Sequence, residues 1–406
     1  MHSRSWVNVE SVATPAERFA AAKKRGTHPL TTEFISQFEF GFDEFQIQAC
    51  QAVEDGKAVL VAAPTGAGKT VVGEFAAFSS LSRGKKCFYT TPIKALSNQK
   101  YFEFVERFGE DRVGLLTGDT NINSDADVLV MTTEVLRNML YANSSTLTNL
   151  GSVVMDEVHY LADKFRGAVW EEVLIHLMES VQVISLSATV SNAEEFGEWL
   201  GEVRGSTEVI VSEIRPIPLY QHVLIGNRLI DLFVEPGRVN PEILGLEREA
   251  LRRVKSPRGR RDRYGDTENR LTRADIIDKL QRENLLPAIT FIFSRAGCDT
   301  AVKQCLQAGI KLTSAEERLE IITTAQRYTQ NLAEEDLEVL GYRDWLLALE
   351  RGIAAHHAGL LPSFKGAVED LFKRGLVKAV FATETLSLGI NMPARTVVLE
   401  KLTKWN

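Results

Sequence analysis

The sequence predicts an α/β protein of two domains, each with a parallel sheet flanked by helices. Three observations support this prediction: a length of 406 residues, an alternation of short apolar runs with helical segments, and a glycine-containing loop between the first strong apolar run and the next helix. A chain of this length can bury a separate core in each of two domains. Strands that alternate with helices form βαβ units, whose parallel sheets are covered on both faces.

The predicted elements follow one another in a regular order. Apolar runs that predict buried strands lie at 57–62, 87–90, 113–116, 128–131, 153–155, 183–186, 287–293 and 377–382. Helical segments between them include 71–77, 96–108 and 134–142. Residues 1–35 have few apolar positions at a fixed spacing and are interpreted as a leader or tail. Because ligands of parallel sheets bind beyond the carboxyl ends of the strands, the polar residues after each run are the candidate site residues.

Composition and charge narrow the functional classes. A net charge of −7 argues against a protein whose whole surface binds nucleic acid, although it allows local basic grooves. No apolar run approaches the roughly 18 residues of a membrane span, and the N-terminus lacks the apolar core of a secretory signal, so no membrane partner is expected. The predicted location is the cytoplasm, with an organellar stroma as the alternative. The four cysteines contain no Cys-x-x-Cys pair, which favours buried thiols over a zinc site.

A phosphate-binding loop is predicted at residues 63–70, which read Ala-Pro-Thr-Gly-Ala-Gly-Lys-Thr between a strand and a helix. Backbone N–H groups and the positive end of the helix would cradle phosphate oxygens, at Thr65, Gly66, Ala67 and Gly68. Lys69 would neutralise the outer phosphates, and Thr70 would ligate Mg²⁺. The first position of the usual motif is Gly, whereas here it is Ala63. The alternative, a chance match in a surface loop, is disfavoured by the flanking strand and helix.

Two residues about twenty positions before the loop are candidates for the adenine base. Phe45 could cover the base, and the amide of Gln46 could pair with both its donor and its acceptor edge. Without the loop downstream, a glutamine in this position would more often be a surface residue of a helix.

The run at 153–155 delivers two carboxylates, Asp156 and Glu157, to the same edge of the sheet. Asp156 would hold the Mg²⁺ through its water shell, and Glu157 would position and deprotonate the attacking water. The alternative is a pair of helix N-cap residues. A further run ends at Ser187 and Thr189, small hydroxyls suited to couple the carboxylates to a facing domain.

The motifs occur in the order and approximate spacing of superfamily-two helicases. They are Phe45-Gln46, the loop at 63–70, Thr-Pro-Ile-Lys-Ala-Leu at 91–96, Thr-Gly-Asp at 117–119, Thr-Thr-Glu at 132–134, Asp-Glu-Val-His at 156–159 and Ser-Ala-Thr at 187–189. The Asp-Glu-Val-His box and the Arg-Pro-Ile-Pro-Leu segment at 215–219 resemble the superkiller-type branch of DExH RNA helicases. Within that branch the chain most resembles the large cyanobacterial and plastid enzymes, from about residue 34 to its last residue.

This resemblance implies two RecA-like domains, at residues 36–214 and 215–406, with residues 215–223 crossing into the second sheet. It implies an ATP- and Mg²⁺-dependent enzyme that moves 3′ to 5′ on single-stranded RNA or on RNA with a 3′ overhang, with protein cofactors as further partners. The implied RNA-binding residues are Thr91, Pro92, Lys94, Thr117, Gly118, Thr132, Thr133, Ser294, Arg295, His356, His357, Gly359 and Thr383. Glu384 is implied in coupling and Gly389 in nucleotide binding. A metal site at the adjacent histidines is disfavoured, because neighbouring side chains point apart.

The resemblance also marks two departures. The arginine-rich sixth motif, which stabilises charge on the transferring phosphoryl group, does not occur before residue 406, so we expect a fragment with an incomplete second domain and weak turnover. A polar insertion at 235–273 includes the run 252–263, with seven basic residues and one acidic residue. This run is interpreted either as a solvated linker or as an RNA contact. Two alternative functions stay open: a DNA helicase of the sibling repair branch, and a nucleotide-gated RNA-binding module.

Overall fold

The structure is a computed structural model that describes residues 27–162, 167–188, 193–225, 228–235, 237–246, 271–383, 386 and 392–400. It divides into two compact units, Met1–Pro218 and Leu219–Asn406. The first 26 residues of the predicted leader and the basic run at 252–263 lie outside the described residues.

Unit 1 contains an eight-stranded sheet in the order β4-β3-β5-β2-β6-β7-β1-β8. All neighbouring strands are parallel except β3 and β4, which are antiparallel. The strands are β1 (Ala58–Ala62), β2 (Lys86–Thr91), β3 (Val113–Leu116), β4 (Asn121–Ile122), β5 (Val128–Thr132), β6 (Leu150–Met155), β7 (Gln182–Ser187) and β8 (Thr207–Val211). The predicted α/β class is confirmed, and each apolar run of the first half lies in a strand.

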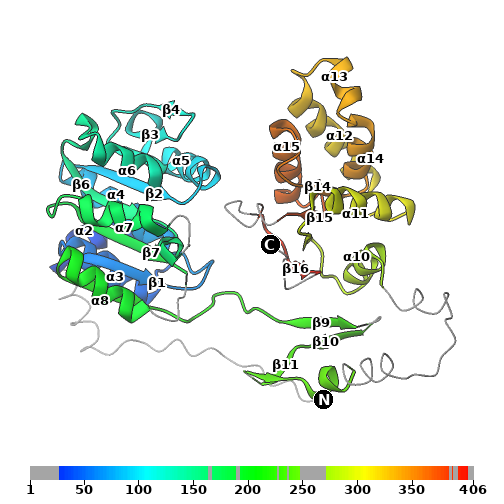
Figure 1. The fold of residues 1–406 in the computed structure, drawn as a ribbon, viewed down its shortest axis with the longest axis horizontal. Helices are drawn as coiled ribbons and strands as arrows, with labels where there is room; N and C mark the ends of the chain where they lie inside the picture. The colour runs from blue at the N-terminus through cyan, green and yellow to red at the C-terminus, as the bar shows by residue number, and fades with distance from the viewer. Residues whose placement is uncertain are drawn as a thin grey trace. The chain divides into compact units, whose positions relative to one another are not determined.

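Helices cover both faces of this sheet (Figure 1). They are α2 (Pro29–Ile35), α3 (Glu44–Glu54), α4 (Thr70–Ser82), α5 (Lys94–Phe108), α6 (Thr133–Tyr141), α7 (Gly167–His176) and α8 (Ala193–Arg204), with short 3₁₀ segments at Glu110–Arg112, Ser145–Leu147 and Val158–Ala162. Alternate residues of β1 enter two cores: Val59 and Val61 pack with α3, α4 and α5, and Leu60 packs with α6, α7 and α8. Burial of both faces explains why the strands read as continuous apolar runs.

Helix α2 belongs to the folded part of unit 1. The sequence interpretation assigns residues 27–35 to the leader, and the structure corrects this, because Phe34 is fully buried. Its ring meets that of Phe75 on α4 edge to face, with centroids 5.3 Å apart. Phe34 thus anchors α2 in the core, with Leu30 packed against the same cluster.

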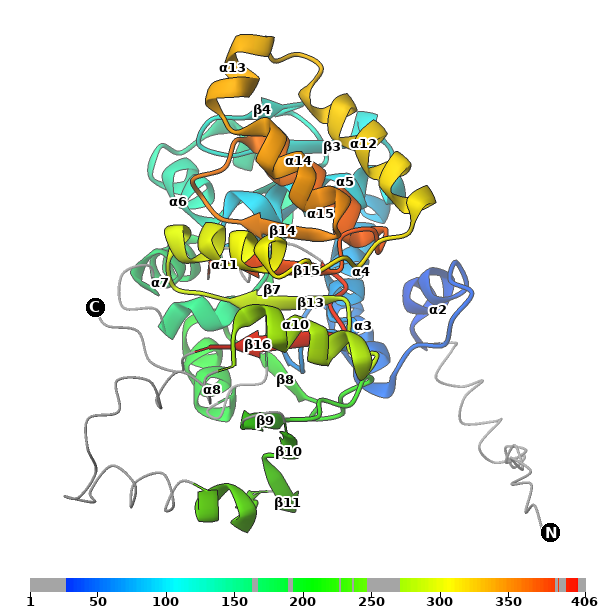
Figure 2. The same ribbon diagram turned by 90° about the vertical axis from the view of Figure 1, so that its right-hand side faces the viewer.

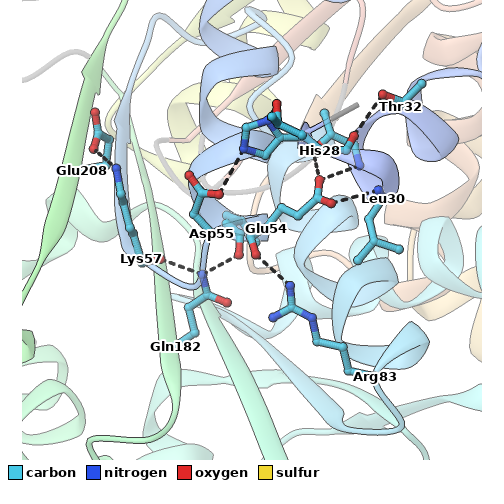
Figure 3. Close-up of polar contacts among 12 residues, drawn as sticks. His28, Leu30, Thr32, Glu54, Asp55, Lys57, Arg83, Gln182 and Glu208 are labelled. Atoms are coloured by element: carbon cyan, nitrogen blue, oxygen red, sulfur yellow. Dashed lines mark hydrogen bonds and ion pairs between the residues drawn. The ribbon is translucent and has the colours of Figure 1, made fainter. Parts of the chain in front are cut away.

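A polar cluster fastens α2 to the end of α3 (Figure 3). The Glu54 carboxylate accepts hydrogen bonds from Leu30 N at 3.0 Å and from Thr31 N at 2.8 Å. These N–H groups lie in the first turn of α2 and have no partner within the helix, so an acidic side chain there satisfies both the hydrogen bonds and the helix dipole. His28 Nε2 lies 3.0 Å from Asp55 Oδ1 beside it.

Unit 2 contains a four-stranded parallel sheet in the order β14-β15-β13-β16 (Figure 2). Its strands are β13 (Ala288–Phe291), β14 (Ile353–His356), β15 (Ala379–Ala382) and β16 (Thr396–Leu399). Its helices are α10 (Arg273–Arg282), α11 (Arg295–Gln307), α12 (Ala315–Thr329), α13 (Glu334–Val339), α14 (Tyr342–Glu350) and α15 (Pro362–Lys373). One core joins α10 and α11 to the sheet, and a second joins α12, α14 and α15 to it.

The segment before this sheet forms two hairpins. Strands β9 (His222–Ile225) and β10 (Arg228–Asp231) pair antiparallel, as do β11 (Phe233–Glu235) and β12 (Arg238–Val239). The prediction that residues 215–223 begin the second sheet is therefore wrong, because β9 pairs with β10 in a sheet of its own. Among the described residues, no helix is both long and apolar enough to cross a membrane.

Candidate functional site

Three predicted segments meet at one edge of the sheet in unit 1. Strand β1 pairs with β7 so that Ala62 lies beside Ser187, and β6 pairs with β7 so that Met155 lies beside Ser185. The phosphate loop follows β1, the two carboxylates follow β6, and Ser187 ends β7, all at the carboxyl ends of parallel strands. The topology therefore brings together residues about ninety positions apart.

The loop has the backbone geometry that its glycines allow. Gly66 and Gly68 have φ values of +84° and +77°, which favour glycine over other residues. Gly68 has a second requirement, since a Cβ atom there would lie 2.6 Å from Gln46 Nε2. Helix α4 begins at Thr70, so its N-terminus faces the loop. Thr65, Gly66 and Gly68 are exposed, which leaves this part of the loop accessible.

Gln46 holds the loop from α3. It is buried, and its Nε2 donates to Ala67 O at 3.2 Å and to Gly68 O at 3.1 Å. Its Oε1 accepts from Asp43 N at 2.9 Å. Both N–H groups of the amide are thus used by the loop, and the predicted pairing with both edges of adenine stays a prediction, as does the covering role of Phe45.

Lys69 lies folded across its own loop. Its Nζ donates to Ala63 O at 2.7 Å and to Pro64 O at 3.1 Å. Burial lowers the pKa of Lys69, and the negative charges of Glu157 and Asp156 partly oppose that shift. The catalytic roles of Lys69, Asp156 and Glu157 stay predictions.

Asp156 is held by hydrogen bonds to both carboxylate oxygens. Tyr89 Oη donates to Oδ2 at 2.7 Å, and Glu157 N donates to Oδ1 at 2.9 Å. The backbone continues the strand ladder, since Asp156 N donates to Thr90 O. A carboxylate has about four acceptor positions, so this one keeps lone pairs for another ligand.

Glu157 follows in a strained conformation, with φ of +54°. Such values for residues other than glycine concentrate at functional sites, where the surroundings enforce them. Burial, and then the charge of Asp156, raises the pKa of Glu157. A raised pKa strengthens a carboxylate as a proton acceptor, which is what a general base needs. Glu157 Oε2 also lies 3.3 Å from His159 Nδ1.

The donor set at this edge fits Mg²⁺. Thr70 supplies a hydroxyl oxygen and Asp156 a carboxylate oxygen, both hard ligands. Within the described residues, no group of three or more His, Cys, Asp or Glu side chains could hold a metal ion. Mg²⁺ at such a site takes few protein ligands and is completed by phosphate and water.

The predicted coupling residues are only partly described. Ser187 ends β7 and is buried, and its Oγ has no hydrogen-bond partner among the described residues. Its carbonyl accepts from Ala63 N at 3.2 Å, which ties β7 to the phosphate loop. Thr189, Glu384 and Gly389 lie outside the described residues.

The predicted RNA-binding residues of unit 1 lie at or just after the carboxyl ends of β2, β3 and β5. Thr91, Pro92, Thr132 and Thr133 are buried. Thr91 Oγ1 donates to Ile93 O at 3.0 Å, and Thr133 Oγ1 donates to Thr91 O at 3.2 Å. These side chains stabilise the turns at the strand ends, so any RNA contact made there would fall to the backbone.

The exposed side chain among them is that of Lys94. Its Nζ donates to Asp119 Oδ2, and Thr117 Oγ1 donates to Oδ1 of the same carboxylate at 3.1 Å. The hydrogen bond from Lys94 lowers the pKa of Asp119. Sequence reasoning gives Asp119 no role, although its place in the Thr-Gly-Asp motif is a signal. Gly118 is exposed between these residues.

In unit 2, Ser294, Arg295 and Gly359 lie together beyond the carboxyl ends of β13 and β14. Ser294 caps α11, since its Oγ accepts from Gly297 N at 3.2 Å. Arg295 is exposed, and its Cδ would lie 3.6 Å from a Cβ atom on Gly359. Thr383 follows β15, and its N donates to His356 O at 3.3 Å.

His356 and His357 are buried, and the RNA contact implied for them stays a prediction. His356 Nε2 lies 2.8 Å from Glu369 Oε1, and His357 Nε2 lies 3.0 Å from Asp299 Oδ1. Gly359 N donates to His357 Nδ1 at 3.1 Å. Both imidazoles therefore hold the turn after β14.

The chain resembles a helicase family and helicases of known sequence. Residues 43–196 match the DEAD/DEAH box helicase family. The chain is 57% identical over 387 residues to the probable helicase HelY of Mycobacterium leprae, with 92% of this chain and 42% of HelY covered. It is 44% identical over 416 residues to the chloroplastic DExH-box ATP-dependent RNA helicase DExH15 of Arabidopsis thaliana, with 92% and 34% covered. The chain thus spans less than half the length of these relatives.

A solved structure shares the fold. The helicase Lhr of Mycobacterium smegmatis, bound to ssDNA and AMP-PNP, matches with a TM-score of 0.56 at 25% identity. The match covers 91% of this chain and 43% of that one. It agrees with the RecA-like architecture implied by the motifs.

Proposed function

We propose, from the match of residues 43–196 to the DEAD/DEAH box helicase family, that this chain binds ATP with Mg²⁺ and uses ATP hydrolysis to move along RNA or to unwind it. The direction proposed by resemblance is 3′ to 5′. The observation that carries the proposal is the sheet order β6-β7-β1, which places the phosphate loop after β1 and the Asp156-Glu157 pair after β6 at the carboxyl ends of parallel strands.

Each residue of this edge has a role in the proposed reaction. The loop N–H groups and Lys69 bind the phosphates, and Glu157 accepts a proton from the attacking water. Thr70 and Asp156 would hold Mg²⁺, which neutralises charge on the phosphates when it is bound. Ser187 would transmit the state of the nucleotide away from the loop whose backbone it contacts.

RNA is proposed as the substrate because the relative DExH15 is named an RNA helicase. Lys94, Gly118 and Arg295 would supply a sequence-independent grip on the phosphate backbone, since they are exposed beyond the strand ends. Protein cofactors are proposed as further partners. The cytoplasm is the proposed location, with an organellar stroma as the alternative that the chloroplastic relative supports.

A DNA helicase is the second candidate, because Lhr was solved with ssDNA. The two candidates differ in what accelerates ATP hydrolysis. Steady-state turnover should be measured with single-stranded RNA, with DNA of the same sequence, and without nucleic acid. RNA should accelerate turnover more than DNA does. Equal acceleration by DNA would contradict the RNA assignment. If the wild-type protein bound no ATP in Mg²⁺ buffer, the proposed nucleotide site itself would be contradicted.

A further inference from the structure

Asp156 and Thr70, the two candidate Mg²⁺ ligands, each accept a hydrogen bond from a buried side chain of residues 89–100. Tyr89 on β2 donates its Oη to Asp156 Oδ2 at 2.7 Å. Lys100 on α5 donates its Nζ to Thr70 Oγ1 at 3.1 Å. Tyr89 is fully buried and Lys100 is 7% exposed. Neither residue has a role in the function proposed above.

A glycine inside helix α4 leaves space for the ring of Tyr89 and lowers the stability of that helix. Gly73 lies inside α4, where glycine is less favourable than alanine by about 1 kcal/mol. A Cβ atom there would lie 2.7 Å from Tyr89 Cε2. The ring also meets Phe104 of α5 edge to face, with centroids 5.0 Å apart. The missing side chain therefore lets the ring pass against α4 and reach Asp156 at the end of β6.

Tyr89 acts only as a donor toward Asp156. Burial, and then the charge of Asp156, raises the pKa of Tyr89 well above its ordinary value, so the hydroxyl keeps its proton. Together with Glu157 N on Oδ1, Tyr89 on Oδ2 fixes the rotation of the carboxylate. The lone pairs that remain on Asp156 then have a fixed direction.

Lys100 acts on Thr70 in the same way. The hydroxyl accepts one hydrogen bond from Nζ, which leaves its own proton and one lone pair for other partners. The ammonium is balanced by Glu103, whose Oε2 accepts from Nζ at 2.7 Å. Its positive charge also opposes the rise in the pKa of Glu157. Lys100 therefore joins Thr70 of the site to Glu103 of its own helix.

We propose that Tyr89 and Lys100 are positioning residues that orient Asp156 and Thr70 for the Mg²⁺ that accompanies the nucleotide. The proposal rests on the proposed function, because it concerns the same metal. Preorganised ligands pay less ordering cost when the ion binds, so the gain appears only when Mg²⁺ is present. Residues around a metal site orient its ligands in this way.

The test compares nucleotide affinity with and without the metal. A fluorescent ATP analogue is titrated into the full chain in Mg²⁺ and in EDTA, for wild type, Tyr89→Phe and Lys100→Met. The ratio of the two Kd values measures the enhancement by Mg²⁺. Each variant should lose about tenfold of this enhancement, as expected for one buried hydrogen bond, while its Kd in EDTA stays within about twofold of wild type.

Matched controls separate positioning from folding. Tyr101→Phe removes a hydroxyl from α5, the helix that carries Lys100. Lys85→Met removes an exposed ammonium. Both variants should keep the wild-type ratio of the two Kd values. Weakening by the same factor in EDTA and in Mg²⁺ would show a purely structural role and overturn the proposal. A wild-type ratio in both Tyr89→Phe and Lys100→Met would also overturn it and leave the proposed function intact. A wild-type protein without any enhancement by Mg²⁺ would instead contradict the proposed function.

Discussion

Replacing Glu157 by glutamine should slow hydrolysis and stabilise the protein at the same time. The substitution keeps the shape and backbone conformation of the side chain but removes its charge. Loss of a general base slows a reaction by about 10²- to 10⁴-fold. At 1.36 kcal/mol for each factor of ten, this loss corresponds to about 2.7 to 5.4 kcal/mol of transition-state stabilisation.

The effect on stability follows from the raised pKa of Glu157. The group ionises above its ordinary pKa of 4.5 in the unfolded chain, whereas folding disfavours the charged form. Its contribution to stability is therefore full below the ordinary pKa and is lost as pH rises through the raised folded pKa. Glu157→Gln should unfold at a higher Tm than wild type at pH 8, and the difference should narrow toward pH 5.

Two measurements check this prediction. Steady-state turnover with saturating ATP and RNA gives kcat, and thermal unfolding at pH 5 and pH 8 gives the Tm difference. Glu208→Gln, which removes a carboxylate from an exposed ion pair with Lys57, serves as control and should change neither quantity appreciably. Turnover of Glu157→Gln within tenfold of wild type, or a lower Tm at pH 8, would refute the assignment of a half-buried general base.

Three further predictions address the rest of the chain. Lys69→Ala should weaken ATP binding roughly ten- to hundredfold in a fluorescence titration, as loss of a charged phosphate donor implies, whereas Lys57→Ala should leave the Kd unchanged. Phe34→Ala should lower the free energy of unfolding in urea by about 3 to 5 kcal/mol, and Phe40→Ala, at 55% exposure, by much less; equal effects would contradict the packing of α2. Deleting residues 250–265 should weaken RNA binding and flatten its salt dependence, and unchanged binding across salt concentrations would remove the basic run from the interface.

The phosphate loop and the Asp156-Glu157 pair could be predicted from the sequence, because each is encoded in one contiguous segment. A buried strand, a turn with two glycines at positive φ and a helix that starts at Thr70 are all local features. The Asp156-Glu157 pair is likewise local, since it directly follows the run of β6. Parallel pairing then brings these segments together without further information from side chains.

Other features depend on contacts that residue types do not reveal. The local sequence does not show that Phe34 packs against Phe75 of α4 or that Glu54 accepts from the first turn of α2. The residue types around the turn after β14 do not reveal that His356 and His357 are buried and lie within hydrogen-bond distance of Glu369 and Asp299. The contact of Tyr89 with Asp156 spans 67 residues and needs the gap left by a glycine in a third element.

The central claim is that ATP bound at this site changes the grip of the chain on RNA. The most direct measurement is the Kd of Glu157→Gln for a labelled RNA with a 3′ overhang, with saturating Mg²⁺-ATP and without nucleotide. Because this variant should keep ATP binding and turn ATP over about 10²- to 10⁴-fold more slowly, the two states can be compared before ATP is consumed. If ATP tightens RNA binding, RNA must tighten ATP binding by the same factor. The account predicts a lower Kd for RNA when ATP is bound. The same Kd in both states, with ATP binding verified, would contradict it.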